Sequence, residues 1–354
     1  MEKTSKQTVE EKPLLEQESA LDRSPSGKNP AVAIEPVAEG VWLVRLPLPW
    51  PLAIVNIYLL EQQDGLLLID CGVKTDESLD VLSQALATLG KTFQDIRQIV
   101  VTHMHADHVG AASELRQRSK APVLMERSEA KLIAPREPGE EFFGKAERYM
   151  REHGVPEELI GRLREMSRKA SGVSERLVAD GYIDEGDTLP YSHGTLEAMV
   201  TPGHSPGLLS FLCRQQRLLF SSDVILNGIT PNIGVHPFYD DDPLGDYFRS
   251  LDRLHELDIG LVLPSHGDPF RGHREWITET RGHHDERLRR VRAAAEGGEH
   301  TAFELVPRIW RQKLSLIDQR LAMAEALSHL QFLHNRGDLV SVRRDGRVLW
   351  ASRS

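Results

Sequence analysis

The sequence predicts an α/β (α+β) protein with a first domain of strands and helices and a smaller, mostly helical domain after it. Two observations carry this prediction. Short runs of Val, Ile and Leu alternate with helical patterns between about residues 31 and 274. From residue 275 the pattern is mostly helical, and the chain closes on the hairpin signal Asp345-Gly346.

The composition is that of a globular protein. The chain has 354 residues, of which 40% are hydrophobic and 27% charged, and this length suffices for two domains. Residues 1–30 are polar and poor in aromatic residues, so we expect a disordered leader. No apolar run reaches the roughly 18 residues that a membrane helix needs, and the N-terminus has no apolar signal-peptide centre. We therefore expect a cytoplasmic protein without a membrane partner.

Charge and cysteine content narrow the function classes. Residues 274–354 carry 15 Lys and Arg against 11 Asp and Glu, whereas the rest carries 28 against 42. The acidic body disfavours long polyanions, although the basic tail leaves nucleic acid open as a partner. Cys71 and Cys213 are far apart in apolar runs, so any metal would be held by nitrogen and oxygen.

The first domain begins with strands and continues as alternating strands and helices. Successive antiparallel strands are expected in "AIEPVAEGVWLVRLPLPWPLAIVNIYLLEQQDGLLLIDCG", broken by Pro and by Asp64-Gly65. Apolar spacing predicts a helix over 74–89, followed by the strand "QIVVT", the helix "DHVGAASELRQRS" and the strand "PVLME". Residues 127–180 are charged and helical in pattern, which indicates either an inserted helical lid or a simple helical connection.

Strands then return, and a helical tail follows. The later strands are "TLEAMVT", "LLSFLC", "RLLFSSD" and "IGLVLPSH", with a helix in "PLGDYFRSLDRLHEL". Helical patterns follow in "WITETRGHHDERLRRVRAAAEGG", "TAFELVPRIW" and "LAMAEALSHLQFLHNRG", before a hairpin in "DLVSVRRDGRVLWAS". Helices followed by a hairpin suggest a winged-helix-like domain over 275–354, after a first domain over 31–274.

The stretch "VTHMHADHVG" indicates a metal site. On an extended segment alternate side chains share a face, so His103 and His105 can hold one ion. If Asp107 and His108 open the next helix, they project toward the same end of the strand and reach a second ion. His204, Asp223 and His266 each follow an apolar strand, and the carboxyl ends of neighbouring strands converge in space.

This set resembles the metallo-beta-lactamase superfamily, whose H-x-H-x-D-H motif is matched by His103, His105, Asp107 and His108. Its later ligands are matched by His204, Asp223 and His266, and the resemblance covers roughly Ala33 to Arg274. It implies a sandwich of two mixed sheets faced by helices. It also implies that one metal is held by His103, His105 and His204, the other by Asp107, His108 and His266, with Asp223 as the bridge.

The resemblance further implies an activity. Asp70 matches an aspartate that holds a ligand through a hydrogen bond, with a turn-capping role as the alternative. Two divalent ions are expected, with zinc as the default and iron or manganese open. The implied chemistry is hydrolysis by a metal-bridging hydroxide, with Asp107 as the catalytic residue that orients it.

The substrate is less defined. An ester, thioester or lactone is the first expectation. True beta-lactamases of this fold generally lack an aspartate at the position of Asp223, and basic glutathione contacts are not found. A second resemblance, to bacterial hydrolases and a mitochondrial endoribonuclease with a winged-helix tail, keeps phosphodiester cleavage open, and a non-catalytic binding or regulatory role is open as well. We expect the tail to serve packing or homo-oligomer formation rather than nucleic-acid binding.

Several further side chains are weaker candidates. Thr230 and Asn232, in "NGITPNIG", are candidates for facing substrate, with a tight turn as the alternative. Tyr149, with Arg148 and Lys145, is a candidate for lining the pocket from above, with an exposed helix as the alternative. The run "RLRRVR" is expected to be mainly a solvated helix face. His283 and His284 are expected to serve helix packing or capping, and His329 to form a helix-surface pair with Glu325.

Overall fold

The computed structural model describes residues 34–50, 52–134, 140–170, 177–235, 242–310 and 313–353. The expected disordered leader, residues 1–30, lies outside these ranges. The described helices include none that is both long and apolar enough to span a membrane.

A seven-stranded sheet contains the first strands in their order along the chain. Its members up to β4 pair antiparallel, and β4 to β7 pair parallel. This mixed pairing follows from the connections, because β4, β5 and β6 are each followed by helical segments. The strands are β1 (Ile34–Ala38), β2 (Val41–Pro47), β3 (Ile54–Gln62), β4 (Gly65–Ile69), β5 (Ile96–Val100), β6 (Val123–Met125) and β7 (Gly181–Tyr182).

A five-stranded sheet faces the first, with the order β12-β11-β10-β9-β8. Its pairs are antiparallel except β11 with β12, which are parallel and are joined through α7 (Pro243–His255). The strands are β8 (Thr188–Tyr191), β9 (Gly194–Val200), β10 (Leu209–Cys213), β11 (Leu218–Ser222) and β12 (Leu261–Pro264).

Alternating side chains on the strands build two separate cores. In β4, Leu66 and Leu68 pack with α1 (Asp76–Thr88) and α3 (Ala112–Ser119), whereas Leu67 and Ile69 pack between the two sheets. The outer face of the second sheet packs on α7. The layers therefore run helix, sheet, sheet, helix, which confirms the predicted sandwich.

The helix expected over "DHVGAASELRQRS" is two helices. α2 (Ala106–Val109) ends at Gly110, and α3 begins at Ala112. The break arises because the Ala111 amide donates to Gly72 O at 3.0 Å, outside the helical ladder. A short 3₁₀ turn, η1 (Phe93–Asp95), precedes β5.

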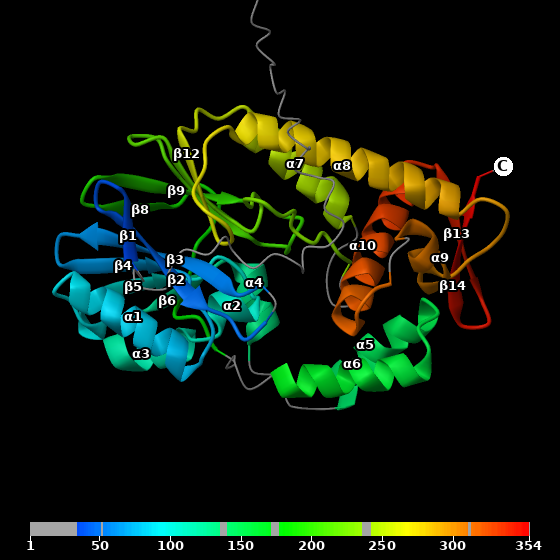
Figure 1. Cartoon of the computed structure of the whole chain (residues 1–354), viewed down its shortest axis with the longest axis horizontal. Helices are drawn as coiled ribbons and strands as arrows, with labels where there is room; N and C mark the ends of the chain where they lie inside the picture. The colour runs from blue at the N-terminus through cyan, green and yellow to red at the C-terminus, as the bar shows by residue number, and fades with distance from the viewer. Residues whose placement is uncertain are drawn as a thin grey trace, which may run out of the picture.

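The segment 127–180 separates into two parts. α4 (Arg127–Ile133) follows β6 directly, whereas α5 (Glu140–Glu152) and α6 (Glu157–Ala170) lie beside the C-terminal helices (Figure 1). There the Phe303 amide donates to His153 O at 3.1 Å, and Val155 and Ile160 join the C-terminal core. The lid function remains a prediction, and residues 135–139 and 171–176 lie outside the described ranges.

The C-terminal elements continue the core of the second sheet. α8 (His273–Ala294) begins at the expected domain boundary, and its buried Ile277 and Leu288 belong to one cluster with α7, α9 (Ala302–Ile309) and α10 (Leu316–Asn335). β13 (Leu339–Arg344) and β14 (Arg347–Ser352) form the predicted hairpin, with positive φ at Asp345 and Gly346. The boundary and the winged-helix-like class remain predictions.

Candidate metal centre

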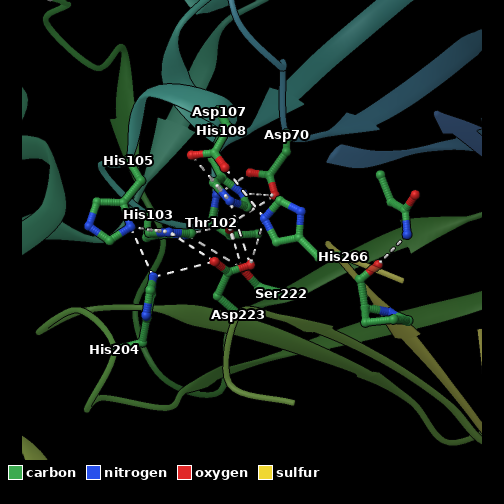
Figure 2. Close-up of polar contacts among 12 residues, drawn as sticks. Asp70, Thr102, His103, His105, Asp107, His108, His204, Ser222, Asp223 and His266 are labelled. Atoms are coloured by element: carbon green, nitrogen blue, oxygen red, sulfur yellow. Dashed lines mark hydrogen bonds and ion pairs between the residues drawn. The ribbon is translucent and has the colours of Figure 1, made fainter. Parts of the chain in front are cut away.

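All seven expected ligands come together at one edge of the sandwich (Figure 2). His103 and His105 follow β5, and Asp107 and His108 lie on the single turn of α2. His204 follows β9, Asp223 follows β11 and His266 follows β12. The strands end at the same edge, and this arrangement gathers side chains that are up to 163 positions apart in the sequence.

Three ring nitrogens form a first group. His105 Nδ1 lies 3.0 Å from His103 Nε2 and 2.9 Å from His204 Nε2. The three rings come from two loops, yet their nitrogens face one point (Figure 2). Three imidazole nitrogens within 4.8 Å of one another have the spacing of ligands around a single cation.

Asp107, His108 and His266 form a second group beside the first. Asp107 Oδ2 lies 3.4 Å from His266 Nε2, and Asp107 Oδ1 lies 3.8 Å from His108 Nε2. The three potential ligand atoms again lie within 4.8 Å of one another. This group contains a carboxylate where the first contains only nitrogens, so the two positions are chemically distinct.

Asp223 lies between the two groups. Its Oδ2 is 3.3 Å from His204 Nε2 and 4.0 Å from His103 Nε2. Its Oδ1 is 3.6 Å from His108 Nε2 and 3.8 Å from His266 Nε2. Each oxygen thus faces a different group, as a carboxylate shared by two cations would.

Hydrogen bonds at Nδ1 fix the orientation of three of the histidine rings. His204 Nδ1 lies 3.0 Å from Asn232 O, and His266 Nδ1 lies 2.9 Å from Ile54 O. A carbonyl oxygen only accepts, so each Nδ1 carries a proton and each ring turns its Nε2 into the centre, where the neutral form of the ring offers a lone pair. His108 Nδ1 donates likewise to Asp70 Oδ2 at 2.9 Å.

The donor set fits a divalent cation. His108 Nε2 and Asp223 Oδ1 are buried and have no hydrogen-bond partner in the described part of the chain. Leaving such atoms without a partner is costly, and a cation between them would remove that cost. The ligands are imidazole and carboxylate, and Cys71 and Cys213 are buried free thiols outside both groups.

The two groups of ligands also differ in the pKa values of their histidines. Burial lowers the pKa of His105 to about 3, and also lowers the pKa values of His103 and His204, so these rings are neutral ligands at pH 7. Burial acts in the same direction on His108, but Asp70, Asp223 and Asp107 outweigh it and raise the pKa of His108 to about 10. The carboxylates thus stabilise positive charge at the second group.

Asp70 is placed to orient two parts of the centre. It has φ of 63°, and its Oδ1 accepts from the Thr102 amide at 2.8 Å. Its Oδ2 accepts from Thr102 Oγ1 at 3.0 Å and from His108 Nδ1. Thr102 Oγ1 in turn lies 3.1 Å from His103 Nδ1, so one buried carboxylate supports a ring in each group.

The loop that carries Thr230 and Asn232 contacts a C-terminal helix. The side-chain Nδ2 of Asn232 donates to Leu321 O of α10 at 3.4 Å, while the backbone carbonyl of Asn232 accepts from His204 Nδ1. Thr230 is half-buried. Tyr149 packs edge-on against His153, with ring centroids 4.5 Å apart, on the side of the C-terminal core. Substrate contact by these three residues remains a prediction.

The histidines of the tail lie in a core. His284 is buried on α8, as the packing interpretation predicts, and its Nδ1 lies 3.1 Å from His329 Nε2. The surface pair expected for His329 and Glu325 is wrong: His329 is fully buried and stacks on His284. Of the run "RLRRVR", Arg289 is exposed, but Arg287 is buried over the Trp310 ring.

Glu129 was not anticipated from the sequence. It is fully buried on α4, and it accepts hydrogen bonds from the Met104 amide (2.8 Å), the Gly207 amide (2.7 Å) and Ser205 Oγ. Burial raises its pKa to about 7. A glutamate in the first turn of a helix ordinarily indicates favourable helix-dipole charge, and no local pattern distinguishes this one.

Comparison with known proteins extends over nearly the whole described chain. The sequence profile "Metallo-beta-lactamase superfamily" matches residues 50–266, and "Metallo-beta-lactamase-like, C-terminal domain" matches 288–352. The probable metallo-hydrolase YqjP of Bacillus subtilis is 29% identical over 307 residues, with 83% of this chain and 92% of the relative covered. The beta-lactamase-like protein 2 homolog of Caenorhabditis elegans is 25% identical over 269 residues, covering 75% and 73%.

Two solved structures are similar over the same range. A metallo-beta-lactamase family protein from Thermus thermophilus has a TM-score of 0.79 and 29% identity, covering 90% of this chain and 100% of its own. A beta-lactamase domain protein from Burkholderia ambifaria has the same TM-score and identity, covering 90% and 94%. At nine tenths of the chain, this similarity includes the C-terminal helices as well as the two sheets.

Proposed function

The chain belongs to the metallo-beta-lactamase superfamily and is a metal-dependent hydrolase, and from this premise we propose that it hydrolyses a small ester, thioester or lactone at a centre of two divalent ions. His103, His105 and His204 hold one ion, and Asp107, His108 and His266 hold the other. Asp223 contacts both. The ions that best suit these nitrogen and oxygen ligands are Zn²⁺ first, with Fe or Mn as alternatives.

The position of Asp223, with one carboxylate oxygen facing each group, is the observation that supports this proposal. Its oxygens face separate sets of nitrogens, at 3.3 Å from His204 Nε2 on one side and 3.6 Å from His108 Nε2 on the other. A single cation would use one of these sets and leave the other without a metal, as buried ligand atoms that lack a hydrogen-bond partner, such as His108 Nε2 and Asp223 Oδ1. Two cations use both sets.

In this proposal the side chains near the metal ions orient the attacking nucleophile and accept its proton. Divalent ions at this position act as Lewis acids and lower the pKa of bound water to about 7. Burial alone would raise the pKa of Asp107, but His108 and His266 lower it below its ordinary value. Asp107 therefore remains a carboxylate at neutral pH, and its oxygens can accept a proton or a hydrogen bond from the attacking nucleophile.

The surface of the C-terminal hairpin favours a small substrate over a polyanion. Arg343 forms an ion pair with Glu152 at 3.2 Å, and Arg344 pairs with Glu299 at 2.7 Å. Arg336, at the end of the helix before the hairpin, pairs with Asp338 at 3.3 Å. Basic side chains that are neutralised by carboxylates attract phosphate weakly. Phosphodiester cleavage is the alternative function, and a cytoplasmic location and oligomer formation through the tail remain predictions.

Metal analysis on single-ligand variants tests the centre. The purified chain is loaded with Zn²⁺, and bound metal per chain is measured by inductively coupled plasma mass spectrometry for wild type, His204→Ala and His266→Ala. We expect two ions in wild type and one in each variant. A wild-type chain that saturates at one ion contradicts the two-metal arrangement.

A substrate panel tests the reaction class. The metal-loaded chain is assayed with a chromogenic ester, a thioester, a lactone, bis-p-nitrophenyl phosphate and single-stranded RNA. Turnover of the first three and not of the last two supports the proposal. The opposite profile, with RNA cleavage lost at high salt, establishes the phosphodiesterase alternative. A fully loaded chain that turns over none of them favours a binding or regulatory role.

A further inference from the structure

Glu129 is a buried carboxylate whose partners all belong to the loops of the candidate metal centre. The side chain projects from α4, is fully buried, and accepts three hydrogen bonds from neutral groups. Its Oε2 accepts from the Met104 amide at 2.8 Å. Its Oε1 accepts from the Gly207 amide at 2.7 Å and from Ser205 Oγ.

These three donors lie next to the three ligands of the first group. Met104 stands between His103 and His105, while Ser205 and Gly207 follow His204. The two loops are about a hundred positions apart in the chain, and His105 Nδ1 and His204 Nε2 nevertheless lie 2.9 Å apart. One carboxylate thus joins the two backbones that must be held at a fixed separation for these nitrogens to meet.

The second group depends on other supports. His108 is oriented by Asp70, and His266 by Ile54 O of β3. The turn before His266 is also held from β3, because Asn56 Nδ2 donates to Pro264 O at 2.9 Å. None of these contacts involves Glu129, so a change at Glu129 acts on one group.

The loop that contains Ser205 and Gly207 lies close to α4. At Gly207 a Cβ atom would collide with Oε2 of Glu126, the N-cap residue of α4, and with Oγ of Ser128 in its first turn. Only a glycine lets the backbone come near enough for its amide to reach Glu129. Gly207 and Glu129 therefore act together: the glycine allows the loop after His204 to lie against α4, and the glutamate hydrogen-bonds the loop there.

We propose that Glu129 is a positioning residue that sets the distance between His105 and His204 and thereby the metal affinity of the first group. This inference rests on the proposed two-metal function. A carboxylate is required because it offers acceptors at both oxygens. A glutamine has one amide nitrogen, which would face either the Met104 amide or the Gly207 amide, so one buried N–H would confront another.

The test is the affinity of each metal site in Glu129→Gln. Stepwise Zn²⁺ affinities are measured by competition with chromophoric chelators, and Co²⁺ spectra identify which site fills. We expect one affinity to fall about 10- to 100-fold, the range found when a group that orients a ligand is lost, with the all-nitrogen site as the one that empties. The other affinity stays at the wild-type value.

Glu147→Gln is the matched control. Glu147 is also a buried glutamate, but its partners are Arg151 and Arg164 in α5 and α6. The same chemical change there leaves both metal affinities at wild-type values. If Glu129→Gln does not fold, Ser205→Ala replaces it, because that variant removes one donor and keeps the carboxylate; the same site then weakens by a smaller factor.

The outcomes separate this inference from the proposed function. Two wild-type affinities in folded Glu129→Gln overturn the positioning role alone. Equal losses at both sites overturn it as well, since they show a general rather than a local effect. A wild-type chain that binds no divalent ion overturns both the inference and the proposed function.

Discussion

Asp70 Oδ2 accepts a hydrogen bond from His108 Nδ1 at 2.9 Å, from a backbone conformation, φ of 63°, that few residue types adopt readily. The carboxylate is 2% exposed and also accepts from the amide and the hydroxyl of Thr102. It therefore fixes the ring of His108 with Nε2 directed at Asp107 and Asp223. Aspartate and asparagine both tolerate this backbone, so the side-chain chemistry can be changed without backbone strain.

Asp70→Asn should weaken the second metal site. An asparagine can still accept from the Thr102 amide through its oxygen, but its NH₂ then faces His108 Nδ1 and cannot accept from it. We expect a fall in affinity at the site of Asp107, His108 and His266 of about 10- to 100-fold. Stepwise Zn²⁺ titration measures it, and a smaller fall is expected at the all-nitrogen site, because Asp70 reaches His103 only through Thr102. Unchanged affinity at the second site would show that Asp70 acts as a turn cap instead.

The C-terminal helix α10 supports a ligand of the first group through a short loop. The Val235 amide donates to Ala324 O at 3.2 Å, and Ser328 Oγ donates to Ile233 O at 2.5 Å. One residue before Ile233, Asn232 O accepts from His204 Nδ1. The tail is thus coupled to the metal centre through three backbone contacts of one short loop.

Gly234→Ala should disturb His204 through this loop. A Cβ at Gly234 would lie 2.7 Å from Ala324 Cβ, which is too close, and overpacking of this kind typically costs about 1–3 kcal/mol. We expect lower stability and weaker metal binding at the first site. The double variant Gly234→Ala, Ala324→Gly removes the clash and should restore metal affinity, although a glycine in α10 costs about 1 kcal/mol of stability. Additive effects of the two changes would disprove the coupling.

Acid should destabilise the helical tail through His329. Burial lowers the pKa of His329 to about 3, and burial lowers that of its partner His284 as well. Folding therefore favours the neutral rings. Their contribution is complete above about pH 7.5 and is lost as the pH falls below 6.5 toward 3, at about 1.4 kcal/mol per pH unit for each ring.

The variant His329→Gln tests whether the free energy of unfolding falls with pH because His329 is buried in its neutral form. Glutamine can accept from His284 Nδ1 and donate to Glu325 O without titrating, so the variant should lose less stability than wild type between about pH 7.5 and pH 5.5. The difference expected for one ring is about 1.4 kcal/mol in the free energy of unfolding at about pH 5.5. Urea denaturation of the metal-loaded chains at both pH values measures it. Parallel losses in the two proteins would contradict a buried neutral His329.

The alternation of strands and helices and the gathering of the seven side chains could be predicted because both leave local signals in the sequence, whereas the sandwich is implied by the resemblance that the H-x-H-x-D-H motif carries. A strand that alternates between two cores, such as Leu66 to Ile69, reads as a continuous apolar run. Histidine and aspartate after such runs are rare enough to stand out. Glu129 and the buried Arg287 left no such signal, since a charged residue on a helix has the same pattern whether it faces solvent or a distant loop. Long-range contacts of this kind depend on packing, which the fold alone determines.

Asp107→Asn should separate metal binding from turnover. Because His108 and His266 lower the pKa of Asp107, the carboxylate is charged at neutral and mildly acidic pH, and the acid limb of the pH–rate profile does not arise from it. The asparagine keeps an oxygen that can face the second site but cannot accept a proton. We expect kcat to fall about 10²- to 10⁴-fold, the usual contribution of a general base, at matched metal content. Steady-state kinetics on fully loaded variant and wild type measure the ratio. A variant with nearly wild-type kcat at equal metal content would assign Asp107 to coordination alone and leave the proton to another acceptor.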